Sequence, residues 1–487
     1  MGAYKLASPR RAILAGVVFI IIILIFLTHN SFHSFPRAEK APSLGPGREQ
    51  PAREEEVQGQ DSLNLPSEYT PVSKEPSFCA EHFGLLYLES LRDSATQYCT
   101  TPSSSDLTCF HSKTASDRVD TFCLGRNVRF GGNSRKFSLQ CELGKPSAPE
   151  LPFSVPKFNQ FQTYWYETGP KVIFKQWVGL SDDSMGSVPS EPLTYLILVK
   201  REMAHNLWHS LMEIFSMTMS VDVLRITPRP NNNSENRPFV ADSDLAHTQV
   251  VLLDDIEDGP FLELWSLLGN KPPIRIKDLP EDTVLQNIVV PLAGGSNPLW
   301  QGDWTIHSCE ESALLRTFSR RVLDFHGLPS SQPRQFHSIV LTFIDRTSTR
   351  RLVNSESFLA ELQSKYTHVA VQSFDFATIT LKEQLEIIQA TDILVGVHGA
   401  GLTHGFFLSP RSAVVEILPP KLSHKGFRNI ASLMDLSYFS AHSDSPPMTK
   451  RGWQEEDVYL ERERFLDLID AAVKSMYNRG ERNYDAV

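Results

Sequence analysis

Residues 393–410 read ILVGVHGAGLTHGFFLSP and decide the fold of the second half of this chain. An apolar run typical of a buried strand ends at His398, and glycines follow before an apolar, helix-like segment begins. A strand that turns through glycines into a helix presents free backbone N–H groups at a positive helix end. Glycine also lets a ligand approach the backbone closely. The pattern therefore predicts a loop, His398-Gly399-Ala400-Gly401, that binds an anion such as phosphate.

The glycine spacing in this loop matches neither of two common nucleotide motifs. It is not GxGxxG, and it lacks the Gly-Lys-Ser/Thr of a Walker A loop. A tight turn with only a structural role is the alternative. His398, at the strand end, is the better candidate for a phosphate or sugar contact, whereas His404 could equally be a packed or capping histidine.

Strands and helices alternate on both sides of this loop. Apolar strands are expected at residues 338–344, 368–374, 392–397, 412–418 and 436–441, with helices between them. Strands that are apolar on both faces indicate a parallel sheet covered by helices, and right-handed crossovers then give a Rossmann-like domain at 333–487. A last helix, at 455–477, is expected to lie beyond this sheet and to cross back over the first half of the chain.

A similar series precedes it. Strands are expected at 193–199, 249–253 and 287–292, and helices at 206–224, 260–268 and 310–325. This predicts a Rossmann-like domain at 151–332, and hence an α/β protein with two such domains in tandem and a cleft between them. In such sheets ligands bind beyond the carboxyl ends of the strands.

Two further strand ends carry candidate ligand-binding residues. Arg346 follows the strand at 338–344, where its guanidinium could clamp a diphosphate through two parallel hydrogen bonds. Arg350 and Arg351 follow within the same loop, and we expect one of them to be merely exposed. Glu416, on the strand after the glycine loop, could accept hydrogen bonds from ribose hydroxyls or could simply be a solvated strand-end acid.

In the first half, the helix at 206–224 begins with a polar row. Asn206, His209 and Glu213 recur at i, i+3 and i+7, which places all three on one face. Such a row suits a general base with its orienting partners, although His209 could instead be a buried or capping histidine. Asp254-Asp255 could imitate a metal-binding DxD motif, but a helix N-terminal acidic cluster is favoured and no metal site is expected.

The N-terminal residues indicate a membrane anchor. Residues 12–28 are uncharged and almost wholly aliphatic, and as a helix they span roughly 25 Å, which suits the thinner early secretory membranes. Lys5, Arg10 and Arg11 predict that residues 1–11 form a cytoplasmic tail. A cleaved signal peptide is the alternative, but no small-residue cleavage site follows. Residues 29–77, rich in Pro, Glu, Gln and Ser, are expected to form a flexible stem.

The cysteines agree with a luminal location. Five of the six lie between Cys79 and Cys141, the sixth is Cys309, and no pair has CxxC spacing. An even count in an oxidising compartment predicts up to three disulfides, and we expect residues 78–150 to form an irregular, stapled region. Asn232 lies in a glycosylation sequon. The net charge of −10 gives no support for a nucleic-acid partner.

The motifs together resemble glycosyltransferase family 61. The likeness is carried by VGVHGAGLTH at 395–404, by AVVEI at 413–417, by the arginine-bearing strand end at Arg346, and by the Asn-x-x-His helix at 206–209. It covers roughly residues 193–441. Within that family, residues 381–407 look most like the members that attach N-acetylglucosamine to EGF domains.

The resemblance implies an inverting transferase of GT-B architecture that uses a UDP-sugar without an obligatory metal, although a divalent cation could stimulate it. The C-terminal domain would hold the donor diphosphate through Arg346 and the loop residues His398, Gly399, Ala400, Gly401 and Thr403, with Glu416 near the ribose. Asn206, His209 and Glu213 would face the acceptor from the N-terminal domain, with His209 or Glu213 as the base.

The donor sugar stays open between N-acetylglucosamine and xylose. The acceptor would be a hydroxyl of a secretory-pathway protein, at Ser or Thr, or of a glycan. The chain ends in NRGERNYDAV rather than in an ER-retention tetrapeptide, so Golgi and endoplasmic reticulum membranes are both compatible with it. A membrane-anchored lectin-like or inactive family member is the alternative. A Rossmann oxidoreductase is disfavoured because no GxGxxG follows the first strand of either sheet.

Overall fold

The computed structural model describes residues 65–477 except residues 74, 101–102, 132, 181–193, 230–236, 281–283, 329–337 and 445–451. The expected cytoplasmic tail, the anchor at 12–28, most of the stem and the sequon at Asn232 lie outside the described residues. Among the helices that are described, none is both long enough and apolar enough to cross a membrane.

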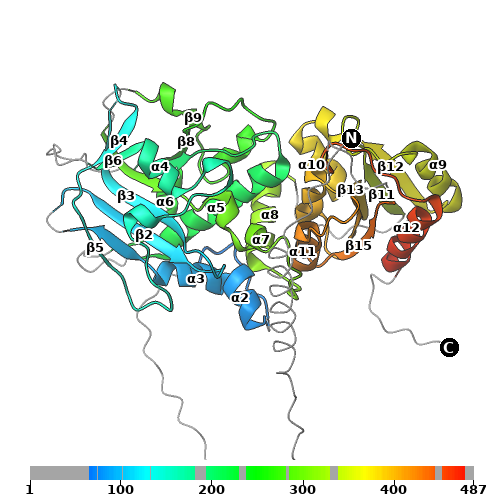
Figure 1. Cartoon of the computed structure of the whole chain (residues 1–487), viewed down its shortest axis with the longest axis horizontal. Helices are drawn as coiled ribbons and strands as arrows, with labels where there is room; N and C mark the ends of the chain where they lie inside the picture. The colour runs from blue at the N-terminus through cyan, green and yellow to red at the C-terminus, as the bar shows by residue number, and fades with distance from the viewer. Residues whose placement is uncertain are drawn as a thin grey trace, which may run out of the picture. The chain divides into compact units, whose positions relative to one another are not determined.

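The second half forms the parallel sheet expected around the glycine loop (Figure 1). Its five strands are β11 (Ile339–Ile344), β12 (Val369–Phe374), β13 (Ile393–Val397), β14 (Ala413–Leu418) and β15 (Ser437–His442). They lie in the order β12-β11-β13-β14-β15, and all neighbouring pairs are parallel. Every residue of β13 and β14 is buried, as the doubly apolar sequence predicts. The strand order reverses between β11 and β13, which makes their carboxyl ends the expected ligand site.

Helices cover this sheet. They are α9 (Ser355–Lys365), α10 (Leu381–Gln389), α11 (Gly426–Leu433) and α12 (Arg462–Met476). The start of α10 is set by a capping box, in which Thr380 and Glu383 satisfy each other's backbone N–H groups. The prediction that the last helix crosses back over the first half is wrong. Helix α12 packs on β14, β15 and α9, because its apolar face (including Phe465, Ile469 and Val473) belongs to the core of the second sheet.

The first half is built on a larger, mixed sheet. Its parallel part consists of β7 (Tyr195–Val199), β8 (Thr248–Leu252), β9 (Ile274–Arg275) and β10 (Val284–Val290), in the order β10-β7-β8-β9. This part confirms the three strands expected from the sequence and adds the short β9. The long helix α5 (Leu207–Ile226) follows β7, and a 3-10 helix, η3 (Leu262–Ser266), replaces the helix expected at 260–268.

The cysteine-rich region is not irregular, and that prediction is wrong. It begins with α2 (Ser77–Phe83) and α3 (Leu85–Asp93), and its strands are β1 (Thr96–Cys99), β2 (Asp106–Ser112), β3 (Asp120–Gly131), β4 (Lys136–Leu139) and β5 (Leu143–Ser147). Strand β3 pairs antiparallel with β10, so these strands extend the first sheet. Further along the chain, α4 (Pro170–Gln176) leads into β6 (Val178–Leu180), which pairs with β4. These strands were not predicted because most of them are short and are interrupted by polar residues. The longest, β3, is recognisable as part of the sheet only through its pairing with β10, far along the chain.

Three disulfides use all six cysteines. Cys109–Cys123 joins residues that lie directly opposite each other on β2 and β3, and Cys99–Cys141 closes the neighbouring edge of the sheet. Cys79–Cys309 connects α2 to the segment before α8 (Ala313–Phe325), across a sequence separation of 230 residues. The expected count of disulfides is therefore confirmed.

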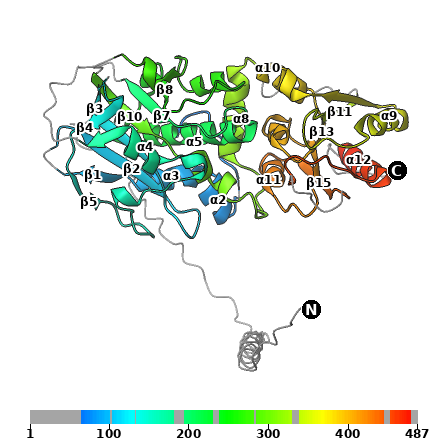
Figure 2. The same ribbon diagram turned by 45° about the horizontal axis from the view of Figure 1, so that its top comes forward.

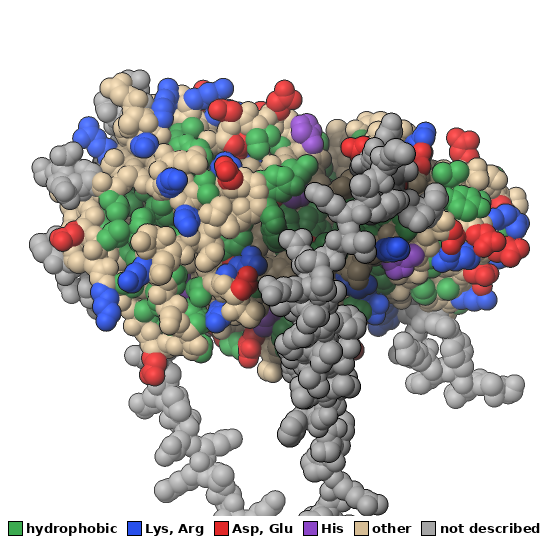
Figure 3. Space-filling model, in the orientation of Figure 1, with side chains coloured by type: hydrophobic (Ala, Val, Ile, Leu, Met, Phe, Trp, Pro, Cys, Tyr) green, Lys and Arg blue, Asp and Glu red, His purple; other side chains and the backbone are tan. Residues whose placement is uncertain are grey.

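Both sheets share one apolar core. Phe318 on α8 packs against Phe215 of α5 and against Phe406, which follows β13. Figure 2 shows α8 between the elements of the first sheet and helices α10 and α11. One continuous core cluster runs from α3 and α5 to Leu385 and Ile430 around the second sheet. On the face seen in Figure 3, side chains of Lys and Arg are interspersed with those of Asp and Glu.

Removal of the longest-range disulfide should cost the most stability. Chain-entropy arguments assign about 5 kcal/mol to a loop of the length closed by Cys79–Cys309 and about 3 kcal/mol to that closed by Cys109–Cys123. The double variant C79A/C309A should therefore unfold at a lower urea concentration than C109A/C123A. Equal midpoints, or the reverse order, would show that the Cys79–Cys309 bond does not constrain the unfolded chain in this way.

Candidate active site

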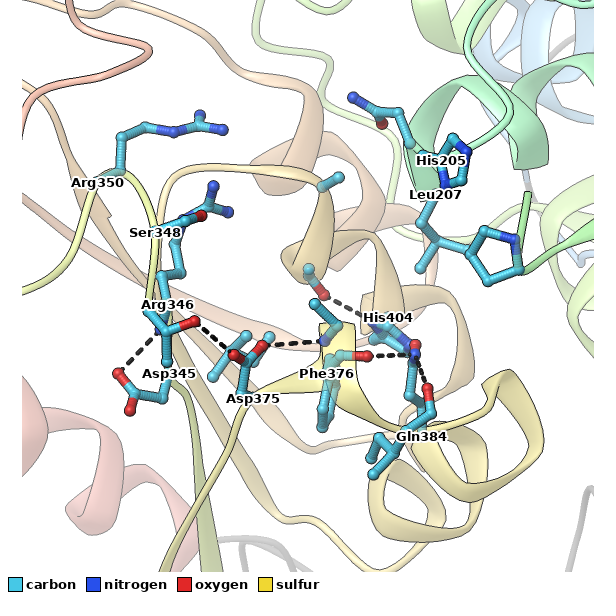
Figure 4. A pocket seen from close by; sticks show the side chains of 18 of the residues that line it. His205, Leu207, Asp345, Arg346, Ser348, Arg350, Asp375, Phe376, Gln384 and His404 are labelled. Atoms are coloured by element: carbon cyan, nitrogen blue, oxygen red, sulfur yellow. Dashed lines mark hydrogen bonds between the residues drawn. The ribbon is translucent and has the colours of Figure 1, made fainter. Parts of the chain in front are cut away.

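A cavity of about 460 Å³ opens at the carboxyl ends of the strands, where both sheets contribute loops. From the second sheet it is lined by residues that follow β11, β12 and β13, and from the first sheet by residues that follow β7 and β8 (Figure 4). The lining includes Arg346 and Arg350 on one side and His205 and Asn206 on the other. The cavity therefore lies at the reversal of strand order, as the ligand rule for such sheets predicts.

Two partly buried guanidinium groups point into this cavity (Figure 4). Arg346 is held by the carbonyl of Thr349, which accepts from its Nε at 2.8 Å, and Arg350 donates from Nη1 to the carbonyl of His398 at 2.9 Å. Within the described residues neither side chain forms a salt bridge with a carboxylate, and Nε of Arg350 is buried without a hydrogen-bond partner. Burial, and to a smaller extent the charge of Arg346, lower the pKa of Arg350 to about 10.

The pKa of Arg346 is also lowered by burial, while the charge of Asp375 opposes that shift. Both groups still carry their charge at neutral pH, since even the lowered pKa of Arg350 lies well above 7. Two partly desolvated cations without a carboxylate partner repel each other, so their presence at one cavity indicates a site prepared for an anion. By contrast, Arg351 is exposed and bonded to Asp457, which confirms that one arginine of this loop lies on the surface.

The glycine loop lets the two arginines approach. A Cβ on Gly399 would lie 2.9 Å from Nη1 of Arg346 and 3.3 Å from Nη1 of Arg350, so only glycine leaves the guanidiniums in place. Ala400 and Gly401 line the cavity, and the helix expected after them forms as a 3-10 helix, η7 (Ala400–Phe407). Thr403 is fully buried, and its hydroxyl has no partner among the described residues.

His398 and Glu416 form a buried pair beside this loop. Nδ1 of His398 lies 2.6 Å from Oε1 of Glu416, whose other oxygen accepts from the Tyr438 hydroxyl at 2.5 Å. Neither His398 nor Glu416 lines the cavity. Glu416 is 0% exposed, so in this arrangement it orients His398, and His398 in turn holds Arg350 through its backbone carbonyl.

His404 reaches the cavity, although the sequence left its role undecided. Its Nδ1 bonds to the carbonyl of Gly401 at 2.8 Å, so this nitrogen carries the proton. Nε2 is then a bare acceptor, and it is buried without a partner. Burial lowers the pKa of His404 to about 4, which keeps the ring neutral at physiological pH. The sequence feature that pointed to His404 as a cavity residue was its position one helical turn beyond the glycines.

On the first sheet, a histidine–carboxylate pair stands where the polar row begins. Asn206 caps α5 by accepting from the backbone of Trp208 at 3.0 Å, and His209 lies in the first turn. Nδ1 of His209 is 2.8 Å from Oε2 of Glu202, a residue that the sequence reasoning missed. Glu202 lies three residues beyond the end of β7. The sequence gives little sign of its role, since it is a single acidic residue seven positions before His209.

Glu213 contacts the backbone of this histidine–carboxylate pair. Its carboxylate accepts from the backbone N–H of Glu202 at 3.1 Å. Full burial, together with the nearby charge of Glu202, raises the pKa of Glu213 well above its ordinary value. Because it is buried and points at the backbone of Glu202, Glu213 is placed to hold the pair in position.

Asp254 accepts from buried Arg201 at 2.8 Å, a different arrangement from the helix N-terminal cluster favoured by the sequence. In the part of the chain that the structure describes, no group of three or more His, Cys, Asp or Glu side chains is arranged to hold a metal ion. The fold and the site thus define an α/β protein with two sheets, a cavity lined by arginines and by the glycine loop, and a histidine–carboxylate pair at the start of α5 that does not itself line this cavity.

Comparison with known proteins shows which family of α/β proteins this chain resembles. Residues 207–415 match the family model described as Glycosyltransferase 61. The chain is 27% identical over 230 residues to the EGF domain-specific O-linked N-acetylglucosamine transferase of Drosophila melanogaster, an alignment of 46% of this chain and 41% of that protein. It is 32% identical over 113 residues to the Mus musculus protein of that name (23% of this chain, 21% of that protein). The Xenopus laevis protein of that name is 36% identical over 115 residues (23% and 22%).

The chain therefore carries a glycosyltransferase 61 domain, which confirms the resemblance inferred from its motifs. The matched segment begins at α5 and ends within β14, so it includes His209, Arg346 and the glycine loop. The chain spans less than half the length of these curated relatives.

Lowering the pH should reduce the free energy of unfolding, because the ring of His404 is buried and neutral in the folded protein. The unfolded chain binds a proton below pH 6.5, whereas the folded ring does so only near pH 4, so acid favours unfolding over this window. At about 1.4 kcal/mol per pKa unit, the loss at pH 5 is about 2 kcal/mol. In urea unfolding at pH 7 and pH 5, His404→Asn, whose amide can still donate to Gly401, should lose less stability than the wild-type protein. An unchanged pH dependence would contradict this assignment.

Proposed function

We propose that this protein is an inverting glycosyltransferase that transfers a sugar from a UDP-sugar to a hydroxyl group. The observation that carries the proposal is the pair of partly buried guanidiniums, Arg346 and Arg350, which share a cavity without a carboxylate as salt-bridge partner among the described residues. A diphosphate is the anion that two such forks suit, because each can donate two parallel hydrogen bonds. The glycosyltransferase 61 domain and the names of the relatives support the same reaction class.

On this proposal the second sheet binds the donor. The diphosphate lies between Arg346, Arg350 and the backbone of Ala400 and Gly401, whereas Thr403, expected from the sequence to contact the donor, is fully buried and does not line the cavity. The nucleobase extends toward His404, whose bare Nε2 can accept from the imide N–H of uracil. Glu416 keeps the donor role expected of it only indirectly, by orienting His398.

The first sheet supplies the base. With Nδ1 of His209 engaged by Glu202, Nε2 is left as the basic nitrogen, and 12% of the side-chain surface is accessible. The acceptor oxygen forms a bond to the anomeric carbon as the bond from that carbon to UDP breaks, and its proton passes to Nε2. UDP leaves with the electron pair and is stabilised by the two arginines. Attack from the face opposite UDP inverts the anomeric centre.

The proposals for the donor sugar, the acceptor and the metal assume a transferase of GT-B architecture with two domains. We propose N-acetylglucosamine or xylose as the donor sugar, and Ser or Thr of a secretory protein, or a glycan, as the acceptor. The names of the relatives favour N-acetylglucosamine. We propose no obligatory metal, since two cations already face the diphosphate, while a divalent ion could stimulate the reaction.

We propose a single-pass type II protein of the Golgi or endoplasmic reticulum membrane, with its catalytic part in the lumen. Three disulfides support an oxidising compartment. The anchor assigned to residues 12–28 can be tested by protease protection of an epitope-tagged chain in microsomes. Cleavage of the bulk of the chain without detergent would contradict the luminal assignment.

A donor screen tests the activity itself. Purified luminal protein is incubated with each common UDP-sugar and a set of secretory-protein and glycan acceptors, and release of UDP is measured. Acceptor-dependent release with one donor supports the proposal. Binding of glycans without any affinity for UDP or a UDP-sugar would instead favour the lectin-like alternative.

Loss of one guanidinium should abolish most of the activity. Arg346→Gln removes the charge and the fork, so kcat/KM for the donor should fall by about 10²–10³-fold. Arg351→Gln is the matched control, since Arg351 lies in the same loop but is exposed and paired with Asp457. If folded Arg346→Gln retains full UDP affinity and activity, the diphosphate assignment is wrong.

Disruption of the histidine–carboxylate pair should separate chemistry from donor binding. His209→Asn removes the base, so kcat should fall by about 10²–10⁴-fold while the Kd for UDP, measured by calorimetry, stays unchanged. Glu202→Gln should lower kcat less, because the amide can still contact Nδ1 of His209 but no longer brings a negative charge to the imidazolium that forms as the proton is transferred. Wild-type kcat in folded His209→Asn would exclude His209 as the base.

A further inference from the structure

Two large aromatic side chains stand exposed next to the histidine–carboxylate pair. Trp165 is 51% exposed and Tyr166 is 52% exposed. Both lie in the turn between Tyr164 and Thr168, whose backbones pair with each other. The Tyr166 ring meets His209 edge to face, with the ring centroids 5.2 Å apart. Neither residue is used by the donor site or by the proposed proton transfer.

The turn that presents these rings is strained. Tyr166 and Glu167 both adopt left-handed backbone angles, with φ of 58° and 53°, and such angles cost of order 1–3 kcal/mol at each residue that is not glycine. Gly169 follows with φ of 97°, and a Cβ there would lie 2.6 Å from the Tyr164 ring. The strained form is held by Lys200, whose ammonium donates to the Tyr166 carbonyl at 2.8 Å. Strain retained at a surface turn indicates that the position of its side chains matters.

Trp165 is fixed as a flat surface. Its ring stacks on that of Trp300, with an angle of 16° between the planes and 5.7 Å between the centroids. Gly295, which follows β10, makes room for it, since a Cβ there would lie 2.9 Å from the Trp165 ring. Trp300 thus covers one face of the indole, while half of the surface of Trp165 remains exposed.

The same turn is bonded to the catalytic pair. The Thr168 hydroxyl donates to Oε1 of Glu202 at 3.2 Å, while the other oxygen of Glu202 contacts His209. The His209 ring also meets Trp300 edge to face, with centroids 4.8 Å apart. Tyr166 touches His209 directly, and Trp165 is its neighbour in the same turn, so this turn borders the proposed base.

We propose that Trp165 and Tyr166 form the acceptor subsite and that its occupant is a pyranose ring, so that the acceptor is a carbohydrate. This inference rests on the proposed transferase function. The negative face of an aromatic ring attracts the polarised C–H groups on one face of a pyranose. Stacking on Trp165 presents a ring hydroxyl to His209, which takes its proton as the oxygen bonds to the anomeric carbon and UDP departs.

The size of the surface favours a sugar over a folded protein. A stable protein contact needs about 800 Å² from each partner. The exposed aromatic side chain in ring contact with His209 is Tyr166, and Trp165 is its neighbour in the turn. A half-exposed indole beside one half-exposed tyrosine matches one sugar ring.

The test uses the complete luminal protein and separates acceptor binding from donor binding. Saturation-transfer NMR is recorded with oligosaccharides released from total secretory glycoproteins, and in parallel with a folded EGF repeat and a Ser/Thr-rich peptide. UDP affinity is measured on the same preparations by calorimetry. Wild-type protein should give saturation transfer to ring C–H protons of a saccharide.

Matched variants test the stacking itself. Trp165→Ala should weaken saccharide binding and raise the acceptor KM by about tenfold, with the Kd for UDP unchanged. Trp165→Phe should retain part of the binding, whereas Trp165→Leu, apolar but without a flat face, should behave like Trp165→Ala. Phe325→Ala removes an aromatic residue exposed at the end of α8 and serves as the control.

Each other outcome overturns the inference. The carbohydrate assignment fails if no saccharide binds while UDP does, or if the EGF repeat or the peptide binds in a manner that depends on Trp165. Full binding by folded Trp165→Leu would mean a general apolar contact rather than stacking. Absence of UDP binding in the wild-type protein would instead refute the proposed function, and calorimetry distinguishes the two failures.

Discussion

The structure of the site depends on two like charges held together, partly buried, at one cavity. Arg346 and Arg350 repel each other and have lost much of their hydration, and the described residues offer them no carboxylate as a salt-bridge partner. Carbonyl groups of Thr349 and His398 hold them instead. Because a carbonyl orients a guanidinium without cancelling its charge, the positive potential remains available to a ligand. Such an arrangement favours an anion that brings two charges at once.

The glycine loop and the His398–Glu416 pair follow from this constraint. Gly399 leaves space that a side chain would fill, and Glu416 fixes the strand end whose carbonyl receives Arg350. The first sheet carries a different kind of group. His209 is oriented by Glu202, and the buried Glu213 accepts a hydrogen bond from the backbone of Glu202. The core that α8 shares with both sheets joins these halves, so a cation pair and a basic imidazole are supported by one packed interior.

Much of this could be predicted from local sequence. The five strands of the second sheet and α5 are long, apolar and regularly spaced, so their pattern alone identified them. Asn206, His209 and Arg346 were found because each directly follows or begins such an element. Glu202 was missed because a lone acid after a strand carries no distinctive signal. The antiparallel strands of the cysteine-rich region were missed because β3 gains its meaning only by pairing with β10, far along the chain.

The sequence by itself determined the parallel sheet, its glycine loop and the family, because strand apolarity, glycine spacing and the arginine at a strand end are local properties. Only the tertiary structure decided which polar groups remain free. It paired Glu416 with His398, left Nε2 of His404 bare in the cavity, and bonded Arg351 to Asp457 while leaving Arg350 unpaired with any acid in the described residues. The reason is physical: burial and partnership depend on residues far apart in the chain, and they fix whether a charge binds its neighbour or a ligand.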